Sequence, residues 1–219
     1  MRNLFSISLS LAFLAGSAFA EENRVSVDLM GFELSAPGLS GSAETVGISL
    51  EYHLTDRVEI HGLYANGSAE GAPIEAARVN LRYLHPLFGP VSAGPRLDYV
   101  WGAVSGADAS ETLAGVSMRL DLGKRSRVDL SAGSLTGAFG DEVVYELDTR
   151  LDAGNGITFL GGVTHGRETA FGQSGTILSL GGEYAFSEGT YGSLRVNHAE
   201  AAGVEGHVNG VQLGIGLAF

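Results

Sequence analysis

The last twelve residues, 208–219, read VNGVQLGIGLAF and decide how the chain folds. From Val211 to Phe219 every second residue is apolar, and the residues between are Gln, Gly or Ala. A period of two predicts an extended strand with one apolar face. A soluble sheet rarely places such a strand at a chain end, where fraying concentrates. A barrel does, because closure pairs the last strand with the first.

The same rhythm runs back through the chain to Arg24. About twelve alternating segments, with ten as a lower bound, are separated by clusters of Gly, Asn, Asp, Ser or Pro. This spacing predicts an all-β protein built as a meander of strands. The expected strands are 24–35, 45–54, 58–65, 77–83, 91–101, 116–122, 128–133, 145–151, 157–163, 178–186, 193–197 and 208–219.

The connections between these segments are expected to alternate in length. Tight turns are predicted at 55–57, 85–90, 124–126, 154–156 and 187–189, with Gly154-Asn155-Gly156 the strongest hairpin signal. Longer polar loops are predicted at 66–75, 105–111, 167–173 and 199–207. Transmembrane barrels have short periplasmic turns and longer outer loops. An even number of strands then returns the carboxyl terminus to the periplasmic rim.

Composition excludes several classes of protein. The formal net charge is −12 and there is no cysteine, so disulfides and thiolate metal sites are excluded. The acidic balance argues against nucleic acid as a partner, because phosphate binding requires clustered Lys and Arg. Lys124 is the only lysine, so almost every cation is an arginine, which suits ion pairs that hold little water.

The first twenty residues are expected to be a signal peptide. Arg2 supplies a positive start, Leu4–Phe13 an apolar centre, and Ala18-Phe19-Ala20 a small-x-small cleavage site before Glu21. No later segment has the ~20 apolar residues that a spanning helix requires. The predicted domains are therefore the signal peptide at 1–20 and one β-barrel at 21–219. If the protein lies in a membrane, it does so as a barrel.

The leader, the strand rhythm and the terminal Phe219 together resemble Gram-negative outer-membrane β-barrel proteins of the porin-like superfamily. The resemblance implies a transmembrane antiparallel up-and-down barrel in the cell outer membrane, surrounded by lipid and lipopolysaccharide. It also implies an assembly signal at Tyr184 and Phe219 that the outer-membrane assembly machinery recognises through the terminal strand. Aromatic residues are expected to form two interfacial girdles, Tyr52, Tyr83, Tyr184, Phe186 and Phe219 at the inner rim and Tyr64, Tyr99, Trp101 and Tyr145 at the outer. A secreted β-sandwich or lipocalin-like barrel is the alternative, with its apolar faces turned inward.

In a transmembrane barrel the polar strand faces line the lumen. One interpretation is a water-filled constriction with arginines mainly on one wall and carboxylates mainly on the other. The other is an ion-paired interior that plugs a narrow barrel, and twelve strands are compatible with either. The candidate pore-lining residues are Arg78, Arg82, Arg96, Asp98, Arg119, Asp121, Asp129, Glu146, Asp148, Arg150, Glu183 and Arg195, with Glu51 and Glu59 on the second and third strands.

Three functions follow from this reading. The first is passive diffusion of small hydrophilic solutes, and the second is a closed structural or surface-interaction barrel. The third, a barrel enzyme, is disfavoured because none of the six histidines precedes a serine at the H-x-S spacing that outer-membrane lipases and deacylases show. No cofactor or metal site is expected, since no phosphate loop or metal-ligand spacing rises above chance. The sequence leaves the oligomeric state open.

Overall fold

The protein is all-β. The structure, a computed structural model, describes residues 23–37, 39–123, 125–137, 140–168, 174–201 and 205–219. The predicted signal peptide, with Ala18, Ala20 and Glu21, lies outside these residues. The described part of the chain holds no helix that could serve as a membrane span. The strands are β1 Arg24–Ala36, β2 Leu39–Thr55, β3 Val58–Ala69, β4 Ala72–Tyr83, β5 His85–Phe88, β6 Val91–Val104, β7 Ala107–Asp121, β8 Arg127–Gly137, β9 Gly140–Gly154, β10 Ile157–Glu168, β11 Ser174–Ser187, β12 Thr190–Ala201 and β13 His207–Ala218.

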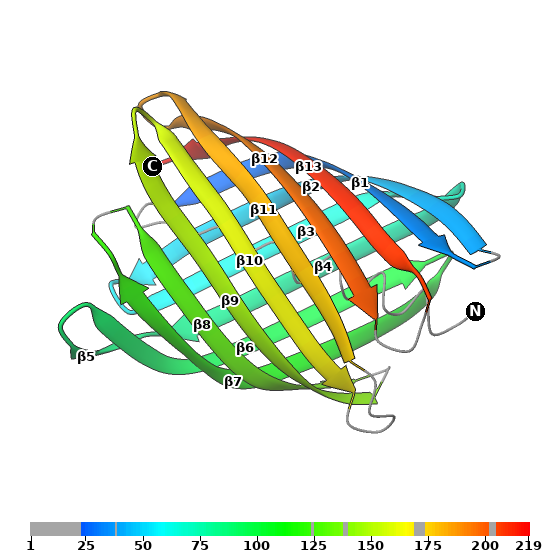
Figure 1. Cartoon of the computed structure of the whole chain (residues 1–219), viewed down its shortest axis with the longest axis horizontal. Coiled ribbons are helices and arrows are strands. Elements are labelled where there is room, and N and C mark those ends of the chain that lie inside the picture. The colour runs from blue at the N-terminus through cyan, green and yellow to red at the C-terminus, as the bar shows by residue number, and fades with distance from the viewer. Residues whose placement is uncertain (1–22, 38, 124, 138–139, 169–173, 202–204) are drawn as a thin grey trace.

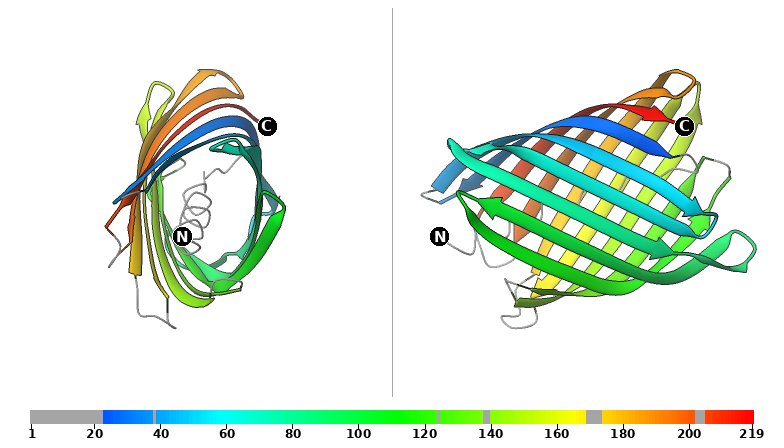
Figure 2. Two further views of the ribbon diagram at one scale, coloured as in Figure 1. Left: turned by 90° about the vertical axis from the view of Figure 1, so that its right-hand side faces the viewer. Right: turned by 180° about the vertical axis from the view of Figure 1, so that it is seen from behind.

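The strands form one closed antiparallel barrel. Consecutive strands pair with each other except β4 and β5, β1 pairs with β13, and the pairing of β4 with β6 completes the ring. The short β5 pairs only with β6 and stands outside this ring, so the barrel has twelve strands and one extra strand. The strands are steeply tilted (Figure 1), and the ring is oval when seen from its end (Figure 2). The predicted fold class is confirmed.

The two ends of the chain close the barrel together. The register of β1 with β13 runs from Arg24 opposite Ala218 to Ser35 opposite His207 without a shift. Beyond it, the backbone N–H of Phe219 donates to the carbonyl of Asn23 at 2.9 Å. The last strand therefore has partners on both sides, as an edge-free barrel requires. The rim that carries Asn23 and Phe219 is called the inner rim below, and the other the outer rim.

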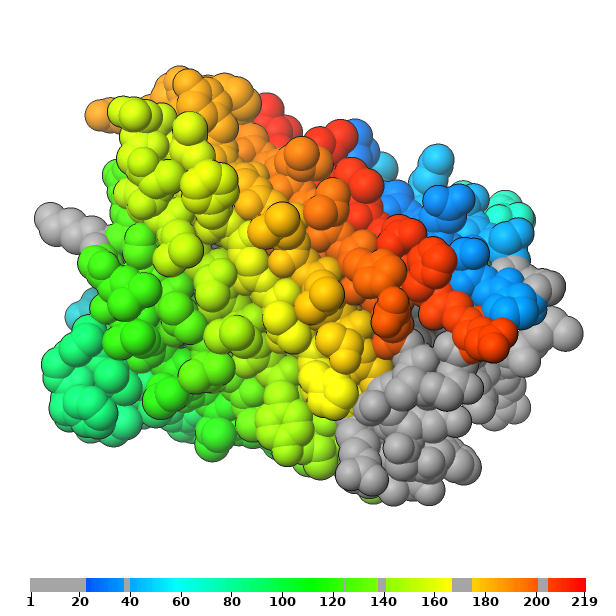
Figure 3. Space-filling model, in the orientation of Figure 1, coloured from blue at the N-terminus to red at the C-terminus, as the bar shows by residue number. Residues whose placement is uncertain are grey.

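The outward strand faces are apolar and exposed. Leu180, Ile215 and Phe219 show 61–67% of their surface, and every strand of the ring carries exposed large apolar side chains. Figure 3 shows this surface, where the side chains of β9–β13 form diagonal rows across the barrel. The β-sandwich and lipocalin-like alternatives are wrong, because they would bury these faces. Among the aromatic residues expected at the two girdles, Trp101 is half-buried. The others are exposed on the outside: Tyr52, Tyr64, Tyr83, Tyr99, Tyr145, Tyr184, Phe186 and Phe219.

Two of the predicted outer loops are strands instead. β3 continues to Ala69 and β4 begins at Ala72, and β6 and β7 likewise leave only Ser105 and Gly106 between them. Both pairs of turn residues have positive φ, 50° and 79° at Glu70-Gly71 and 51° and 81° at Ser105-Gly106. This is the two-residue turn whose twist matches antiparallel strands. The prediction was wrong because it treated polar, glycine-containing segments as loops. A turn of only two residues, the second of them Gly, is enough to connect the two strands.

The predicted turn at 85–90 is also mostly strand. His85–Phe88 pairs with Val91–Ala93, so β6 extends past the end of β4 and only Gly89-Pro90 turns. Pro86 is tolerated in β5 because the strand has a partner on one side only and needs no second donor there. In Figure 1 this hairpin projects beyond the rest of the inner rim. The turn predicted at Gly154-Asn155-Gly156 is confirmed, with φ of 79°, 53° and 77°.

Candidate functional site: the ion-paired lumen

Strand alternation turns the charged residues inward. On β4 the outward Val79 and Leu81 are exposed, while Asn80 between them and Arg78 and Arg82 on either side are buried. The same parity holds on the other strands, since the side-chain period of a strand is two. Of the predicted pore-lining residues, Asp148 and Arg150 are half-buried and Asp121 is exposed at the inner rim. The structure places the others in the buried interior: Arg78, Arg82, Arg96, Asp98, Arg119, Asp129, Glu146, Glu183 and Arg195.

Four further buried charged groups were missed. Arg24, Asp28 and Arg127 are buried beside the predicted residues, and Glu111 is buried on β7 toward the outer rim. The alternation of the sequence could have identified them. Arg24 and Asp28 alternate with the outward Val25 and Val27, and Arg127 lies two residues before Asp129, on the same strand face. They were overlooked because Arg24 and Arg127 stand at the first position of their strands, where a turn residue is also expected.

The first group of ion pairs joins β4, β6 and β9 and is called the boundary cluster: Arg78, Arg96, Asp98 and Glu146. Arg78 Nη2 lies 2.8 Å from Asp98 Oδ2 and 3.8 Å from Glu146 Oε1. Arg96 donates from Nε to Asp98 at 3.1 Å and also pairs with Glu146. Asn80 donates to Asp98 as well. Each arginine therefore contacts two carboxylates, and each carboxylate contacts two arginines.

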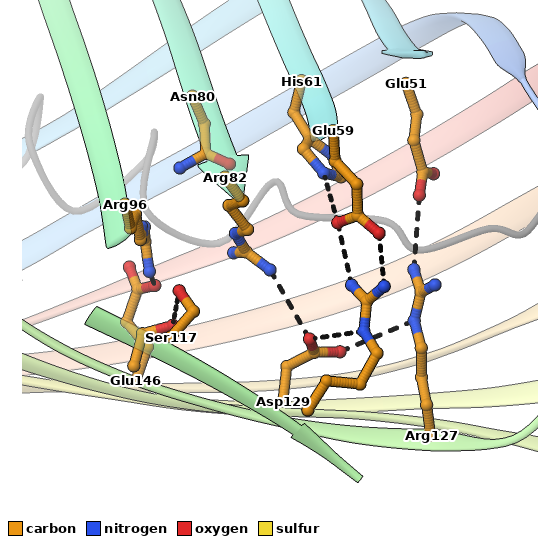
Figure 4. Close-up of polar contacts among 12 residues, drawn as sticks. Glu51, Glu59, His61, Asn80, Arg82, Arg96, Ser117, Arg127, Asp129 and Glu146 are labelled. Carbon is orange, nitrogen blue, oxygen red and sulfur yellow. Dashed lines mark hydrogen bonds and ion pairs between the residues drawn. The ribbon is translucent and has the colours of Figure 1, made fainter. Parts of the chain in front are cut away.

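The second group reaches across the lumen. Arg119 on β7 binds Glu59 on β3 through two contacts, one of 2.9 Å from Nη2, although β4 and β6 lie between these strands in the ring. Arg127 on β8 lies 3.3 Å from Glu51 on β2, five steps away round the barrel. Asp129 joins the two arginines, 2.9 Å from Arg119 Nε and 3.5 Å from Arg127 Nε (Figure 4). These contacts, the cross-lumen pairs, span the interior near the inner rim.

The third group lies at the inner rim on the other side. Arg24 and Glu183 form a bidentate pair with two contacts of 3.0 Å, and Arg150 Nη2 lies 2.8 Å from Glu183. The guanidinium of Arg24 also stacks over the ring of Tyr191 at 4.0 Å. Such planar, bidentate contacts are characteristic of arginine.

The two charge signs are not segregated as expected. Asp98 lies on the same wall as Arg78 and Arg96, and Asp129 lies beside Arg119 and Arg127. The predicted arginine wall and carboxylate wall are therefore wrong. Low-dielectric surroundings favour this mixing, because a buried charge without a partner is far more costly than a paired one.

The wall formed by β10–β13 is thin. Its inward faces carry many small residues, and side chains from neighbouring strands lie over them. A Cβ on Gly162 would lie 2.6 Å from Ser179 Oγ and 2.8 Å from Asp148 Oδ1. A Cβ on Gly214 would overlap the Asp28 carboxylate, and one on Gly216 the ring of Tyr191. These glycines therefore let charged and aromatic side chains lie flat along the wall instead of projecting into the lumen.

The barrel fold is shared with known proteins. The structure matches the NanC porin over 88% of this chain and 100% of that one, with 9% identity and a TM-score of 0.68. It matches an outer membrane channel from Pseudomonas putida F1 over 94% and 98%, with 12% identity and a TM-score of 0.65. The KdgM porin matches over 89% and 99%, with 9% identity and a TM-score of 0.60. The fold is that of outer-membrane porins and channels.

The same fold also serves other functions. The translocator domain of the autotransporter NalP from Neisseria meningitidis matches over 100% of this chain and 96% of its own, with 12% identity and a TM-score of 0.53. No protein-family model and no curated protein sequence matches the chain. With its belt of exposed apolar side chains, the chain has the fold of outer-membrane β-barrel proteins. Among the described residues, no group of three or more His, Asp or Glu side chains is arranged to hold a metal ion.

Proposed function

We propose that the protein is a passive diffusion channel for small hydrophilic solutes, with the ion-paired residues as its constriction. The constriction comprises the boundary cluster, the cross-lumen pairs and the Arg24–Glu183–Arg150 group. Their charges face one another inside a barrel whose outer surface is apolar. Low-dielectric walls of this kind focus the field of the charges on a passing ion. The proposal involves no catalytic step.

One observation carries this proposal, namely that the lumen is lined unevenly. The large ion-paired side chains come mainly from β2–β9, whereas β10–β13 present glycines covered by flat-lying side chains. A solute path along the thin wall leaves the ion pairs intact on the other side. A purely structural interior gains nothing from a wall of glycines, because each one weakens its strand.

Single-channel recording in planar bilayers tests the proposal directly. Protein purified without its leader and shown to be folded by heat-modifiable gel migration should give discrete conductance steps in KCl. Mock-purified membrane fractions from cells that lack the protein serve as the control. Silent bilayers from folded protein, over many insertions, would rule out the channel.

A closed structural barrel is the second candidate, and the cross-lumen pairs favour it. The Arg119–Glu59 and Arg127–Glu51 contacts link strands that are not neighbours, and such contacts hold opposite sides of the barrel together. Arg82, which is 1% exposed beside Asp129, is as buried as a core residue. In this candidate the outer rim, not the lumen, makes the functional contacts.

Export and assembly are part of the same proposal. We infer that residues 1–20 are removed between Ala20 and Glu21, which leaves one domain from 21 to 219. Phe219 is 67% exposed at the inner rim and Tyr184 is 50% exposed on the neighbouring outer surface. Both are accessible to the assembly machinery in the way that the resemblance implies, and lipid with lipopolysaccharide would surround the belt.

A further inference from the structure

The charged residues divide unevenly along the axis of the barrel. We call outer zone the strand ends and turns that lie beyond the boundary cluster, toward the outer rim: residues 30–37, 39–46, 64–76, 100–113, 134–137, 140–145, 164–168, 174–178, 197–201 and 205–210. Arg167 is the only basic residue in these ranges. The acidic ones are Glu33, Glu44, Glu70, Glu75, Asp108, Glu111, Asp141, Glu142, Glu168, Glu200 and Glu205. The outer zone therefore carries a large net negative charge.

The rest of the described barrel is close to charge balance. The arginine–carboxylate pairs of the lumen all lie at the level of the boundary cluster or nearer the inner rim. In the outer zone, Glu70 and Glu75 instead accept hydrogen bonds from neutral groups, the backbone N–H of Ser42 at 2.8 Å and the amide of Asn66 at 3.3 Å. Hydrogen bonds of this kind leave the negative charge of a carboxylate in place.

The acidic residues of the outer zone surround the outer mouth of the barrel. They come from strands all round the ring, namely β1, β2, β4, β7, β9, β10 and β12. Glu33, Glu44, Glu75, Asp108 and Glu200 are exposed. Charges of one sign around an opening with low-dielectric walls raise the local concentration of solutes of the opposite sign. They do so through their field, so no bound position for the solute is required.

One carboxylate of the outer zone lies on the solute path of the proposed function. Glu142 on β9 is half-buried and shares the inward strand face of Val144. A Cβ on Gly166 of β10 would overlap its carboxylate, so Glu142 lies over the outer end of the thin wall. Asp148 lies over Gly162 in the same way, four residues further in on the same face of β10. Two carboxylates thus follow each other along the thin wall, from the outer zone inward.

We propose that the channel prefers cationic solutes, from K⁺ to small organic ammonium ions, over anions of the same size. This inference rests on the proposed function and gives it a substrate class. The field of the outer zone collects cations at the outer mouth, and Glu142 and Asp148 continue the negative charge along the thin wall. The boundary cluster on the other side has two arginines and two carboxylates, so it favours neither sign.

Reversal potentials in KCl gradients across planar bilayers test this preference. The permeability ratio of K⁺ to Cl⁻ should be about ten in dilute KCl of about 0.1 M, the lower end of the enrichment that charges of one sign produce. It should fall toward unity near about 1 M KCl, where the screening length is only about 3 Å. Ethanolammonium and glycolate, two organic ions of similar size and opposite charge, extend the comparison, and ethanolammonium should be the more permeant.

Neutral substitutions identify the charges that are responsible. Glu142→Gln should lower the ratio of K⁺ to Cl⁻ permeability by about twofold in dilute KCl, because it removes a unit charge from the solute path. The combined Glu33→Gln, Glu44→Gln and Glu75→Gln variant should lower it as well, although these exposed side chains act only through their screened field. Asp56→Asn is the matched control, since it removes one charge from an exposed turn at the inner rim and should leave the ratio unchanged.

The outcomes separate this inference from the channel itself. A ratio near unity in dilute KCl, or a preference for Cl⁻, overturns the inference and leaves the channel standing. A cation preference that is unchanged in both glutamine variants also overturns it, because charges outside the outer zone would then set the preference. A folded protein that conducts nothing overturns the proposed function and the inference together.

Discussion

Replacement of Arg96 by serine separates the open channel from the closed barrel. Arg96 is 3% exposed, and its guanidinium contacts both carboxylates of the boundary cluster, Asp98 at 3.1 Å and Glu146. Serine removes the guanidinium and leaves Arg78 as the remaining arginine of the cluster, 2.8 Å from Asp98 and 3.8 Å from Glu146. The cluster then has a net charge lower by one unit.

The open channel and the closed barrel predict different changes in the free energy of unfolding for Arg96→Ser. In a closed barrel, a buried carboxylate loses its partner, and the free energy of unfolding should fall by about 3–5 kcal/mol. In an open channel, water replaces the guanidinium, and the loss should resemble that of an exposed pair, about 0–1 kcal/mol. The added negative charge should then favour cations, because two unit charges about 4 Å apart interact by roughly 1 kcal/mol in water. That energy corresponds to a roughly fivefold shift in the cation-to-anion permeability ratio.

The assay pairs two measurements on one protein preparation. Reversal potentials in a KCl gradient give the permeability ratio, and denaturant unfolding in lipid gives the stability. Arg82→Ser, opposite Asp129 at 3.7 Å, provides a second lumen site. Arg57→Ser, in the exposed turn between β2 and β3, is the matched control and should change neither quantity. An unchanged permeability ratio together with a stability loss above 3 kcal/mol would refute the channel and leave the structural barrel.

Three other outcomes are expected. The protein should fractionate with outer membranes and migrate faster on gels before boiling than after, because a closed barrel resists detergent. Deletion of Phe219 should reduce the amount of assembled protein more than Phe88→Ser, since Phe219 continues the closing strand whereas Phe88 lies on β5, outside the ring. Gly216→Val should lower the free energy of unfolding by about 1–3 kcal/mol, because its side chain overlaps Tyr191, over which Arg24 is stacked.

Each of these expectations has an outcome that contradicts it. Recovery in the soluble periplasmic fraction is incompatible with the apolar belt. Equal membrane levels of the Phe219 deletion and the parent would show that closure does not depend on the last residue. For Gly216→Val, the control is Gly31→Val on the same sheet, where nothing lies within 4 Å of an added Cβ. Equal stability of these two variants would show that the thin wall tolerates side chains.

Sequence by itself determined the architecture, because alternation is a local property. The period of two in each segment decides which residues share a face, whatever the strand pairs with. It placed Arg82 and Glu146 together in the interior and Leu180 outside, and it identified the strand at 208–219 that closes the ring. The hairpin at Asn155-Gly156 was predictable for the same reason, since its backbone conformation depends on two adjacent residues.

Tertiary structure alone decided which charges meet. Arg119 and Glu59 are 60 residues apart and belong to strands that are not neighbours, so no local pattern joins them. Their contact depends on the tilt and closure of the ring, which set how far each side chain reaches across the lumen. The same holds for the length of the strands on either side of Glu70-Gly71 and Ser105-Gly106. The polar segments around them become strands because partners on both sides satisfy their backbone groups, and only the assembled barrel supplies those partners.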